Sequence, residues 1–242
     1  MKLDIIAFGA HPDDVELNCG GTVGRLIQQG FRVGIVDLTQ GEMGTRGTPE
    51  TRTIEAKKAG SVLGIQLREN LRFNDSDIIN DRKHQLSIIE IVRNYKPDIC
   101  LIGAPHDRHP DHGKATDLLK DALFYSGLSK IETGNLEAWR PSHILHYMQD
   151  RPFEPDFIFD ISSTIDLKMD AIKAYETQFN VTDPNGEPET YISSENYFEQ
   201  IKARAKFYGH LSGFEYGEPF KYYNGPIPLN SFQLFSDTKP NR

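Results

Sequence analysis

Cysteine is scarce in this sequence, which contains only Cys19 and Cys100 among 242 residues. Two cysteines are too few for the disulfide framework of a small secreted domain or for a zinc site built from thiolates. Nor does any apolar run approach the roughly 18 residues that a membrane-spanning helix needs. The amino-terminal run Leu3–Gly9 is too short for a signal peptide. These absences predict a cytoplasmic protein without a membrane segment.

Positive charge is also in deficit. The chain has 27 Lys and Arg against 35 Asp and Glu, a formal net charge of −8. Binding to nucleic acid needs a basic surface, so we do not expect DNA or RNA as a partner. Hydrophobic residues make up 38% of the chain, enough for a packed core and too many for a disordered protein. The length suits one sizeable domain, and no linker divides the chain, so we expect a single domain over residues 1–242.

Short β-branched runs alternate with amphipathic stretches through the first half of the chain. The runs predict strands at Leu3–Phe8, Phe31–Leu38, Asp98–Ile102, Ile144–Met148 and Phe157–Ile161. The amphipathic stretches predict helices at Val15–Gln29, Pro49–Leu63, His84–Tyr95, Gly113–Ser126, Ser163–Thr177 and Ser194–Leu211. This alternation is typical of a Rossmann-like α/β fold, a mostly parallel sheet flanked by helices.

The end of the chain has a weaker pattern. Residues Asn180–Pro188 are polar and rich in turn formers, which predicts a surface loop. The tail from Phe214 is rich in aromatic residues, Gly and Pro. We expect this tail to wrap around the domain or to contact another subunit, which favours a homo-oligomer.

Two clusters of polar residues directly follow predicted strands. The first is Ala10–Glu16 (Ala-His-Pro-Asp-Asp-Val-Glu), and the second is Pro105–His112 (Pro-His-Asp-Arg-His-Pro-Asp-His). Ligands of open parallel sheets bind beyond the carboxyl ends of the strands, where the strand order reverses. If the two strands are neighbours across that point, the two clusters face each other.

The residue types in these clusters indicate a catalytic metal. Zinc in enzymes is commonly held by three nitrogen or oxygen ligands, with one position left open. His11 and Asp14 can converge on one ion across a strand-to-helix turn, and either His109 or His112 would complete the set. Such a site accepts zinc or ferrous iron.

Further groups would be left for catalysis if His112 is the third ligand. Asp13 could then act as the general base on water, and His109 could donate a proton or stabilise an oxyanion. Asp111 could orient a histidine. Arg52 and Arg108 suit an anionic group of the substrate, because arginine grips carboxylates bidentately.

A dinucleotide site is the main rival for this fold. The stretch Gly20–Gly24 lacks the G-x-G-x-x-G spacing. The acidic residues of the first cluster would also repel a pyrophosphate at this helix start. We therefore favour the metal site.

The sequence resembles the LmbE-like (PIG-L) family of zinc-dependent N-acetylglucosaminide deacetylases. The resemblance rests on His11-Pro12-Asp13-Asp14 and His109-Pro110-Asp111-His112, and it extends from about Leu3 to Phe220. Three segments, Gly41–Thr48, Asp107–Gly113 and Phe157–Ser162, are similar to the branch that deacetylates N-acetylglucosaminyl malate in bacillithiol biosynthesis. One departure is Val15, where many relatives have glutamate.

The resemblance implies a role for each matched residue. His11, Asp14 and His112 would bind zinc, and Asp13 would be the general base. His109 would be the general acid or oxyanion partner, oriented by Asp111. Arg52 would bind substrate, Arg108 would grip the malate carboxylates, and Tyr197, or else Tyr191, would approach the oxyanion.

The expected function is thus zinc-dependent removal of acetate from a small anionic N-acetylglucosaminide, with the malate conjugate as the first candidate. One alternative is deacetylation of another N-acylglucosaminide. A second is a non-catalytic module that keeps the metal and binds a sugar or carboxylate, although such a module needs no base beside an open metal position. A third, a metal-dependent esterase or phosphoesterase, would normally need more carboxylates for a second metal.

Overall fold

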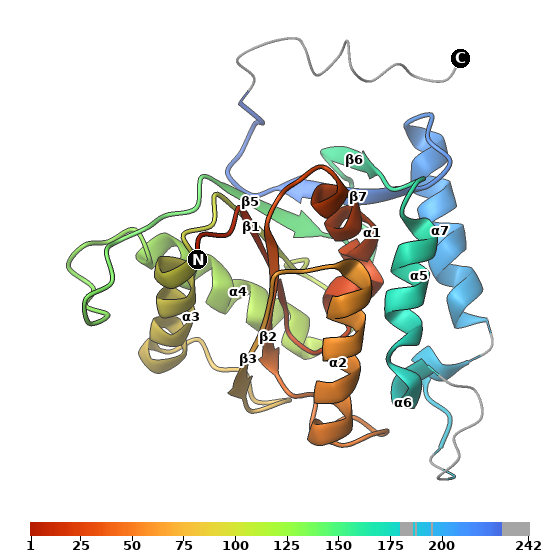
Figure 1. The fold of residues 1–242 in the computed structure, drawn as a ribbon, viewed down its shortest axis with the longest axis horizontal. Helices are drawn as coiled ribbons and strands as arrows, with labels where there is room; N and C mark the ends of the chain where they lie inside the picture. The colour runs from red at the N-terminus through yellow and green to blue at the C-terminus, as the bar shows by residue number, and fades with distance from the viewer. Residues whose placement is uncertain (180–185, 187, 195, 229–242) are drawn as a thin grey trace.

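A computed structural model describes residues 1–179, 186, 188–194 and 196–228, and these form a sheet covered by helices on both faces (Figure 1). The strands are β1 (Ile5–Gly9), β2 (Val33–Thr39), β3 (Leu67–Phe73), β4 (Ile99–Ile102), β5 (His143–Tyr147), β6 (Phe157–Asp160) and β7 (Gly217–Tyr222). The helices are α1 (Asp14–Gln28), α2 (Pro49–Leu63), α3 (Arg82–Tyr95), α4 (Pro110–Tyr125), α5 (Ile165–Lys173), α6 (Glu176–Phe179) and α7 (Tyr197–Leu211), with a 3-10 turn, η1, at Tyr191–Ser193.

The strand order is β3-β2-β1-β4-β5-β7-β6. Strands β1 to β5 are parallel, and β7 runs antiparallel to both β5 and β6. This arrangement confirms the predicted mostly parallel α/β fold. The order reverses at β1, which has β2 on one side and β4 on the other.

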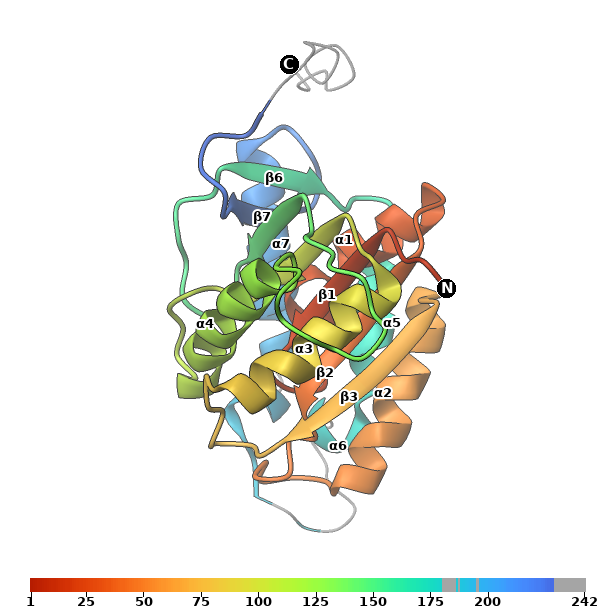
Figure 2. The same cartoon turned by 90° about the vertical axis from the view of Figure 1, so that its left-hand side faces the viewer.

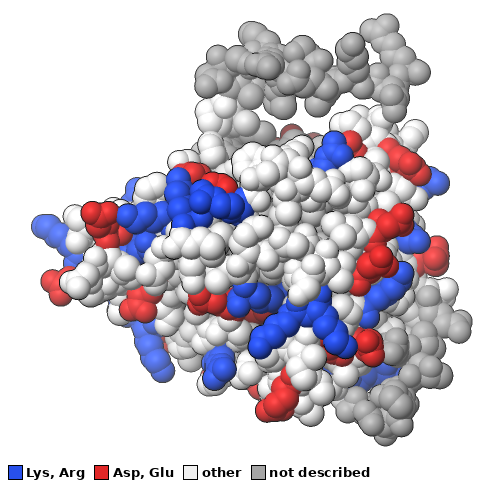
Figure 3. All heavy atoms as spheres, viewed as in Figure 1, with Lys and Arg blue, Asp and Glu red and all other residues white. Residues whose placement is uncertain are grey.

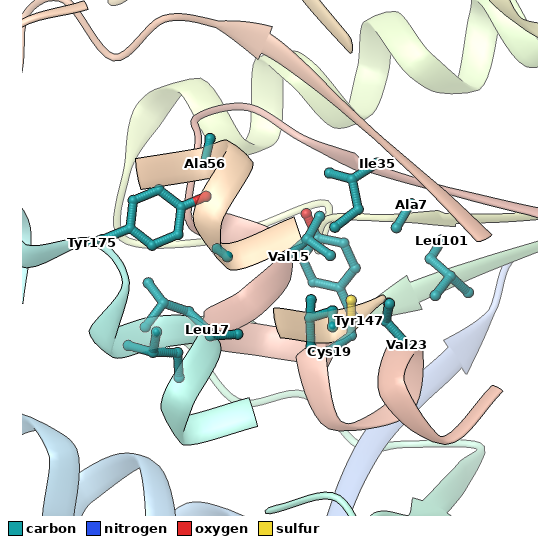
Figure 4. Close-up of a cluster of buried hydrophobic side chains, with 14 of the residues drawn as sticks. Ala7, Val15, Leu17, Cys19, Val23, Ile35, Ala56, Leu101, Tyr147 and Tyr175 are labelled. Carbon is teal, nitrogen blue, oxygen red and sulfur yellow. The ribbon is translucent and has the colours of Figure 1, made fainter. Parts of the chain in front are cut away.

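The helices cover the two faces of the sheet in separate layers. Helices α1, α2 and α5 pack together on one face, while α3 and α4 pair on the other (Figures 1 and 2). Side chains of β1 point alternately to the two faces of the sheet. Ile5 and Ala7 belong to the hydrophobic cluster on one face, and Ile6 and Phe8 belong to the hydrophobic cluster on the other. Figure 4 shows part of the hydrophobic cluster that contains Ala7, where Val15 and Leu17 of α1 lie near Tyr147 and Tyr175. A buried hydrophobic cluster on each face therefore holds the sheet in place.

Helix α1 is interrupted at Cys19, whose backbone is not helical (φ −141°, ψ 20°). The carboxylate of Glu218 in β7 caps the second half of the helix. It accepts hydrogen bonds from the amides of Gly21 (3.1 Å) and Thr22 (2.7 Å) and pairs with the buried Lys168 (2.5 Å). The last strand is therefore tied to the first helix by a buried ion pair.

The prediction for the tail is wrong for residues 217–222. They form β7, which lies inside the sheet between β5 and β6 and does not wrap around the domain, while contact of the tail with another subunit stays a prediction. Pro219 explains the error, since proline lacks the amide that a strand within a sheet normally donates. The predicted helix at Ser163–Thr177 is also split into α5 and α6.

Some predictions fall outside the described part of the chain. Residues 180–185 and 187 of the predicted loop and the tail beyond residue 228 are among them. The single domain stays a prediction. Among the described residues, no helix is long and apolar enough to cross a membrane.

Figure 3 shows acidic and basic side chains mixed around a broad uncharged area on one face.

Candidate active site

The two polar clusters meet at the carboxyl edge of the sheet. Strands β1 and β4 are paired, with Ile5 opposite Ile99 and Ala7 opposite Leu101, so the loops that follow them are adjacent. Each loop leads directly into a helix. Asp13 is the N-cap of α1, with a left-handed backbone (φ 107°), and His109 is the N-cap of α4. Helix α4 begins at Pro110, three residues before the predicted Gly113, so the last three residues of the second cluster, Pro110–His112, lie on its first turn.

The carboxylate of Asp14 lies between two histidines. Its Oδ2 is 3.6 Å from Nδ1 of His11, and its Oδ1 is 3.2 Å from Nε2 of His112. The opposite nitrogen of each ring contacts another acid. Nε2 of His11 lies 3.0 Å from Oδ1 of Asp75, and Nδ1 of His112 lies 2.6 Å from Oδ2 of Asp107.

These contacts fix how each ring is oriented. A carboxylate can only accept, so the nitrogen that faces Asp75 or Asp107 carries the proton. The other nitrogen of each ring faces Asp14 and would offer its lone pair to a metal ion bound beside that carboxylate. Histidines that bind metals are held in this way, by a carboxylate on the far ring nitrogen. The donor set of His11, Asp14 and His112 therefore fits a divalent ion.

Among the described residues, two compact groups of possible ligand atoms contain His11, and neither includes Asp14. Ligand atoms of His11, His109 and His112 all lie within 4.8 Å of one another, and so do those of His11, Asp75 and Asp111. His109 offers only one nitrogen, because its Nδ1 accepts a hydrogen bond from the amide of Asp111 (3.2 Å). The free Nε2 of His109 is thus left to face a ligand or substrate.

Asp13 is paired with Arg52. Nη2 of Arg52 lies 3.1 Å from Oδ2 of Asp13, and Arg52 also donates to the carbonyls of Pro12 (2.6 Å) and Gly41 (3.1 Å). A Cβ on Gly41 would lie 1.8 Å from Nη1 of Arg52, so only glycine allows this approach. Arg52 is 5% exposed, and its Nε has no hydrogen-bond partner. We expected Arg52 to bind substrate, but its guanidinium already holds the Asp13 carboxylate.

Burial dominates the electrostatics of the site. It raises the pKa of Asp13 to about 7, although Arg52 acts in the opposite direction. Burial also acts to raise the pKa of Asp14, but His112 and His11 outweigh it and hold the value well below the ordinary range. Burial, together with the neighbouring His11 and His112, lowers the pKa of His109. Asp14 is therefore ionised, Asp13 is suited to exchange a proton near neutral pH, and His109 is neutral.

The Asp111 side chain has a different place from the one expected. Its Oδ2 accepts a hydrogen bond from the amide of Ser76 (2.8 Å) and lies 3.5 Å from Nε2 of His11. Only its backbone amide contacts His109. The carboxylate therefore helps to orient His11, whereas Asp111 contacts His109 through its backbone amide and not through its side chain.

The remaining predicted residues lie around a pocket over the site. Tyr197 lines this pocket, is 7% exposed and stacks on Phe179, with ring centroids 5.9 Å apart. Tyr191 is 53% exposed and lies outside the lining. Arg108 also lines the pocket, but its Nε donates to Oδ2 of Asp150 (2.8 Å). Tyr197 is thus the tyrosine that reaches the site, and Arg108 is already paired.

Sequence reasoning gave no role to Asp75, Asp107 or Asp150. Asp107 lies inside the second polar cluster, which indicated a role in the site, but the sequence alone could not show that it contacts His112. Asp75 follows β3 in a polar turn at the same edge of the sheet, which is the only local hint of its role. Asp150 follows β5 in the same way.

Comparison with known proteins agrees with this geometry. Residues 6–123 match the PIG-L family, described as GlcNAc-PI de-N-acetylase. The diacetylchitobiose deacetylase of Thermococcus kodakarensis is 28% identical over 91% of this chain and 83% of its own. A probable N-acetyl-alpha-D-glucosaminyl L-malate deacetylase 2 of Bacillus cereus is 30% identical over 74% of this chain and 84% of its own.

A solved structure is similar along nearly the whole length. The conserved protein TT1542 of Thermus thermophilus superposes with a TM-score of 0.82 at 36% identity, covering 95% of this chain and 97% of that one. The family resemblance inferred from the two His-Pro-Asp motifs is confirmed. The chain belongs to the PIG-L (LmbE-like) family of de-N-acetylases, and it is an amidohydrolase.

Proposed function

We propose that this enzyme removes acetate from an N-acetylglucosaminide with the help of zinc held by His11, Asp14 and His112. One observation carries the proposal: the Asp14 carboxylate faces one nitrogen of each histidine, while buried acids hold the other nitrogens. Ferrous iron would suit the same donors. A bound divalent ion supplies Lewis-acid polarisation of the amide carbonyl and lowers the pKa of nearby water.

Asp13 is the general base in this proposal. Its carboxylate lines the pocket beside Asp14, and Arg52 fixes its position. With a pKa of about 7, Asp13 can take a proton from the attacking water as the water oxygen bonds to the carbonyl carbon. It then returns a proton to the nitrogen as the C–N bond breaks, which gives acetate and a free amine.

His109 and Tyr197 stabilise the charge that develops on the carbonyl oxygen. The Nδ1 of His109 accepts the Asp111 amide, so the neutral ring carries its proton on Nε2 and can donate it to an oxyanion. The Tyr197 hydroxyl keeps its proton, since burial raises the pKa of this group. Both residues line the same pocket as Asp13.

Two kinds of aglycone are candidates. N-acetylglucosaminyl malate, the bacillithiol precursor, is supported by the Bacillus cereus relative and by Arg108 at the pocket. An uncharged second sugar is supported by the Thermococcus relative and by the ion pair that already occupies Arg108. A cytoplasmic location and a homo-oligomer stay predictions.

The test is release of primary amine from N-acetylglucosaminyl malate, diacetylchitobiose and free N-acetylglucosamine. The protein is stripped of metal and then reloaded with zinc. Zinc-dependent release from at least one glycoside is the expected result. Stoichiometric zinc binding without release from any of them would contradict the proposal and favour a metal-containing binding module.

A further inference from the structure

The pocket carries little positive charge for an enzyme expected to bind an anion. Among the described residues that line it, the two arginines Arg52 and Arg108 stand against four aspartates: Asp13, Asp14, Asp75 and Asp150. A divalent ion would only balance this excess. The pocket therefore has no large excess of positive charge with which to attract the two carboxylates of a malate group.

Each of these arginines is also already paired. Arg52 is buried against Asp13 and two carbonyls. Arg108 is half-exposed, and its Nε lies 2.8 Å from Oδ2 of Asp150. The Nε edge of its guanidinium is thus occupied, so a side-on bidentate grip of a substrate carboxylate would have to displace Asp150.

The Arg108–Asp150 pair is held in place from a second side. The Arg108 guanidinium carbon lies 4.8 Å from the ring centroid of Tyr191, which forms a cation–π contact. Asp150 also raises the pKa of Arg108, so the arginine keeps its charge and Asp150 keeps its partner. The pair is therefore a fixed, internally neutral element at the pocket.

We propose that Asp150 is a specificity-determining residue that cancels the charge of Arg108 and directs the enzyme toward N-acetylglucosaminides with an uncharged aglycone. This inference rests on the proposed deacetylase function and decides between its two candidate aglycones. Substrates with an anionic aglycone are disfavoured because their carboxylate would meet Asp150 and compete with it for Arg108.

The experiment compares kcat/KM for three substrates: diacetylchitobiose, N-acetylglucosaminyl malate and the dimethyl ester of that malate conjugate. The ester keeps the malate skeleton but removes its charge. We expect the zinc-loaded wild type to favour diacetylchitobiose, and the ester over the diacid, by about tenfold or more. Asp150→Asn should lower the ratio of kcat/KM for the ester to kcat/KM for the diacid by about tenfold, since Arg108 then carries an uncompensated charge.

Asp4→Asn is the matched control. Asp4 pairs with Arg32 (3.0 Å) just before β1, at the opposite edge of the sheet from the pocket. It should leave the ratio unchanged. A wild type that prefers the diacid over its ester, or an unchanged ratio in Asp150→Asn, would overturn the inference.

Ionic strength gives a second test that needs no variant. Salt screens charge interactions. If Asp150 disfavours the diacid, the KM of the wild-type enzyme for N-acetylglucosaminyl malate should stay level or fall as salt is added. A KM that rises with salt would mean that a free Arg108 attracts the carboxylates, and would overturn the inference. If no glycoside is deacetylated, the proposed function fails and this inference falls with it, whereas deacetylation without charge selectivity defeats the inference alone.

Discussion

The Oδ2 atom of Asp107 lies 2.6 Å from Nδ1 of His112, on the side of the ring away from Asp14. Removing this acid should loosen the ring without removing the ligand nitrogen. We expect Asp107→Ala to weaken zinc binding by about 10- to 100-fold, measured by competition with a chromophoric chelator. Asp117→Ala is the control, because Asp117 is an exposed acid of α4, the helix that carries His112. Unchanged affinity in Asp107→Ala would show that His112 needs no carboxylate partner, since Gln149 also lies 2.8 Å from its Nδ1.

His112 itself should be essential for metal. His112→Ala removes a nitrogen that faces Asp14, so zinc content and deacetylation should be lost together. Zinc content by mass spectrometry of the dialysed protein checks this. Full retention of zinc would exclude His112 as a ligand and turn attention to His109.

Asp13 should be needed for turnover but not for zinc binding. Asp13→Ala is expected to lower turnover by about 10²-fold or more, because it removes the base but none of the proposed ligands. Zinc content should stay near that of the wild type. A parallel loss of zinc would make Asp13 a ligand, and turnover near that of the wild type would assign the base elsewhere.

The buried pair of Glu218 and Lys168 should matter for stability. Glu218→Ala leaves Lys168 buried without its partner and uncaps the amides of Gly21 and Thr22. We expect a loss of about 3–5 kcal/mol in the free energy of unfolding, measured with urea. Glu215→Ala, in the exposed turn before β7, should change stability by less than about 0.5 kcal/mol. A similar small change in Glu218→Ala would contradict the role of the cap.

His146 should make stability depend on pH. Burial lowers its pKa below the ordinary value, and Lys120 and Lys221 act in the same direction. The folded protein then binds fewer protons than the unfolded chain, so this stability is complete above the unfolded pKa of about 6.5 and is lost as the pH falls below it. His146→Gln removes the titrating group. Between about pH 8 and pH 5, the wild type should lose more stability in urea than this variant does. Equal losses would contradict the argument.

The sequence predicted four of the five parallel strands, β1, β2, β4 and β5, because these are largely buried on both faces, whereas the polar edge strand β3 was not predicted. Strands buried on both faces are continuous apolar runs, as in Ile5–Gly9, and they stand out from the amphipathic helices between them. Strand β7 has no such run. It places Pro219 and the charged Glu218 inside a sheet, where only tertiary contacts make them acceptable.

The candidate site was predictable where its residues are adjacent in sequence. The spacing of His11 to Asp14 and of His109 to His112 indicates shared chemistry locally. Asp75 and Asp150 belong to the site only because β3 and β5 end at the same edge as β1 and β4. Nor did the sequence reveal that the side chain of Asp111 points toward His11, since helix register sets that direction.

The ties from the carboxyl-terminal third of the chain set an order of assembly during synthesis. Glu218 caps α1 just beyond the proposed ligand Asp14, and Arg204 of α7 donates to Asn18 (3.1 Å) and to the Gln149 carbonyl (2.7 Å). His11 and Asp14 leave the ribosome early, but these supports emerge some two hundred residues later. A nascent chain therefore carries the proposed ligands His11 and Asp14 well before it contains the residues that support helix α1.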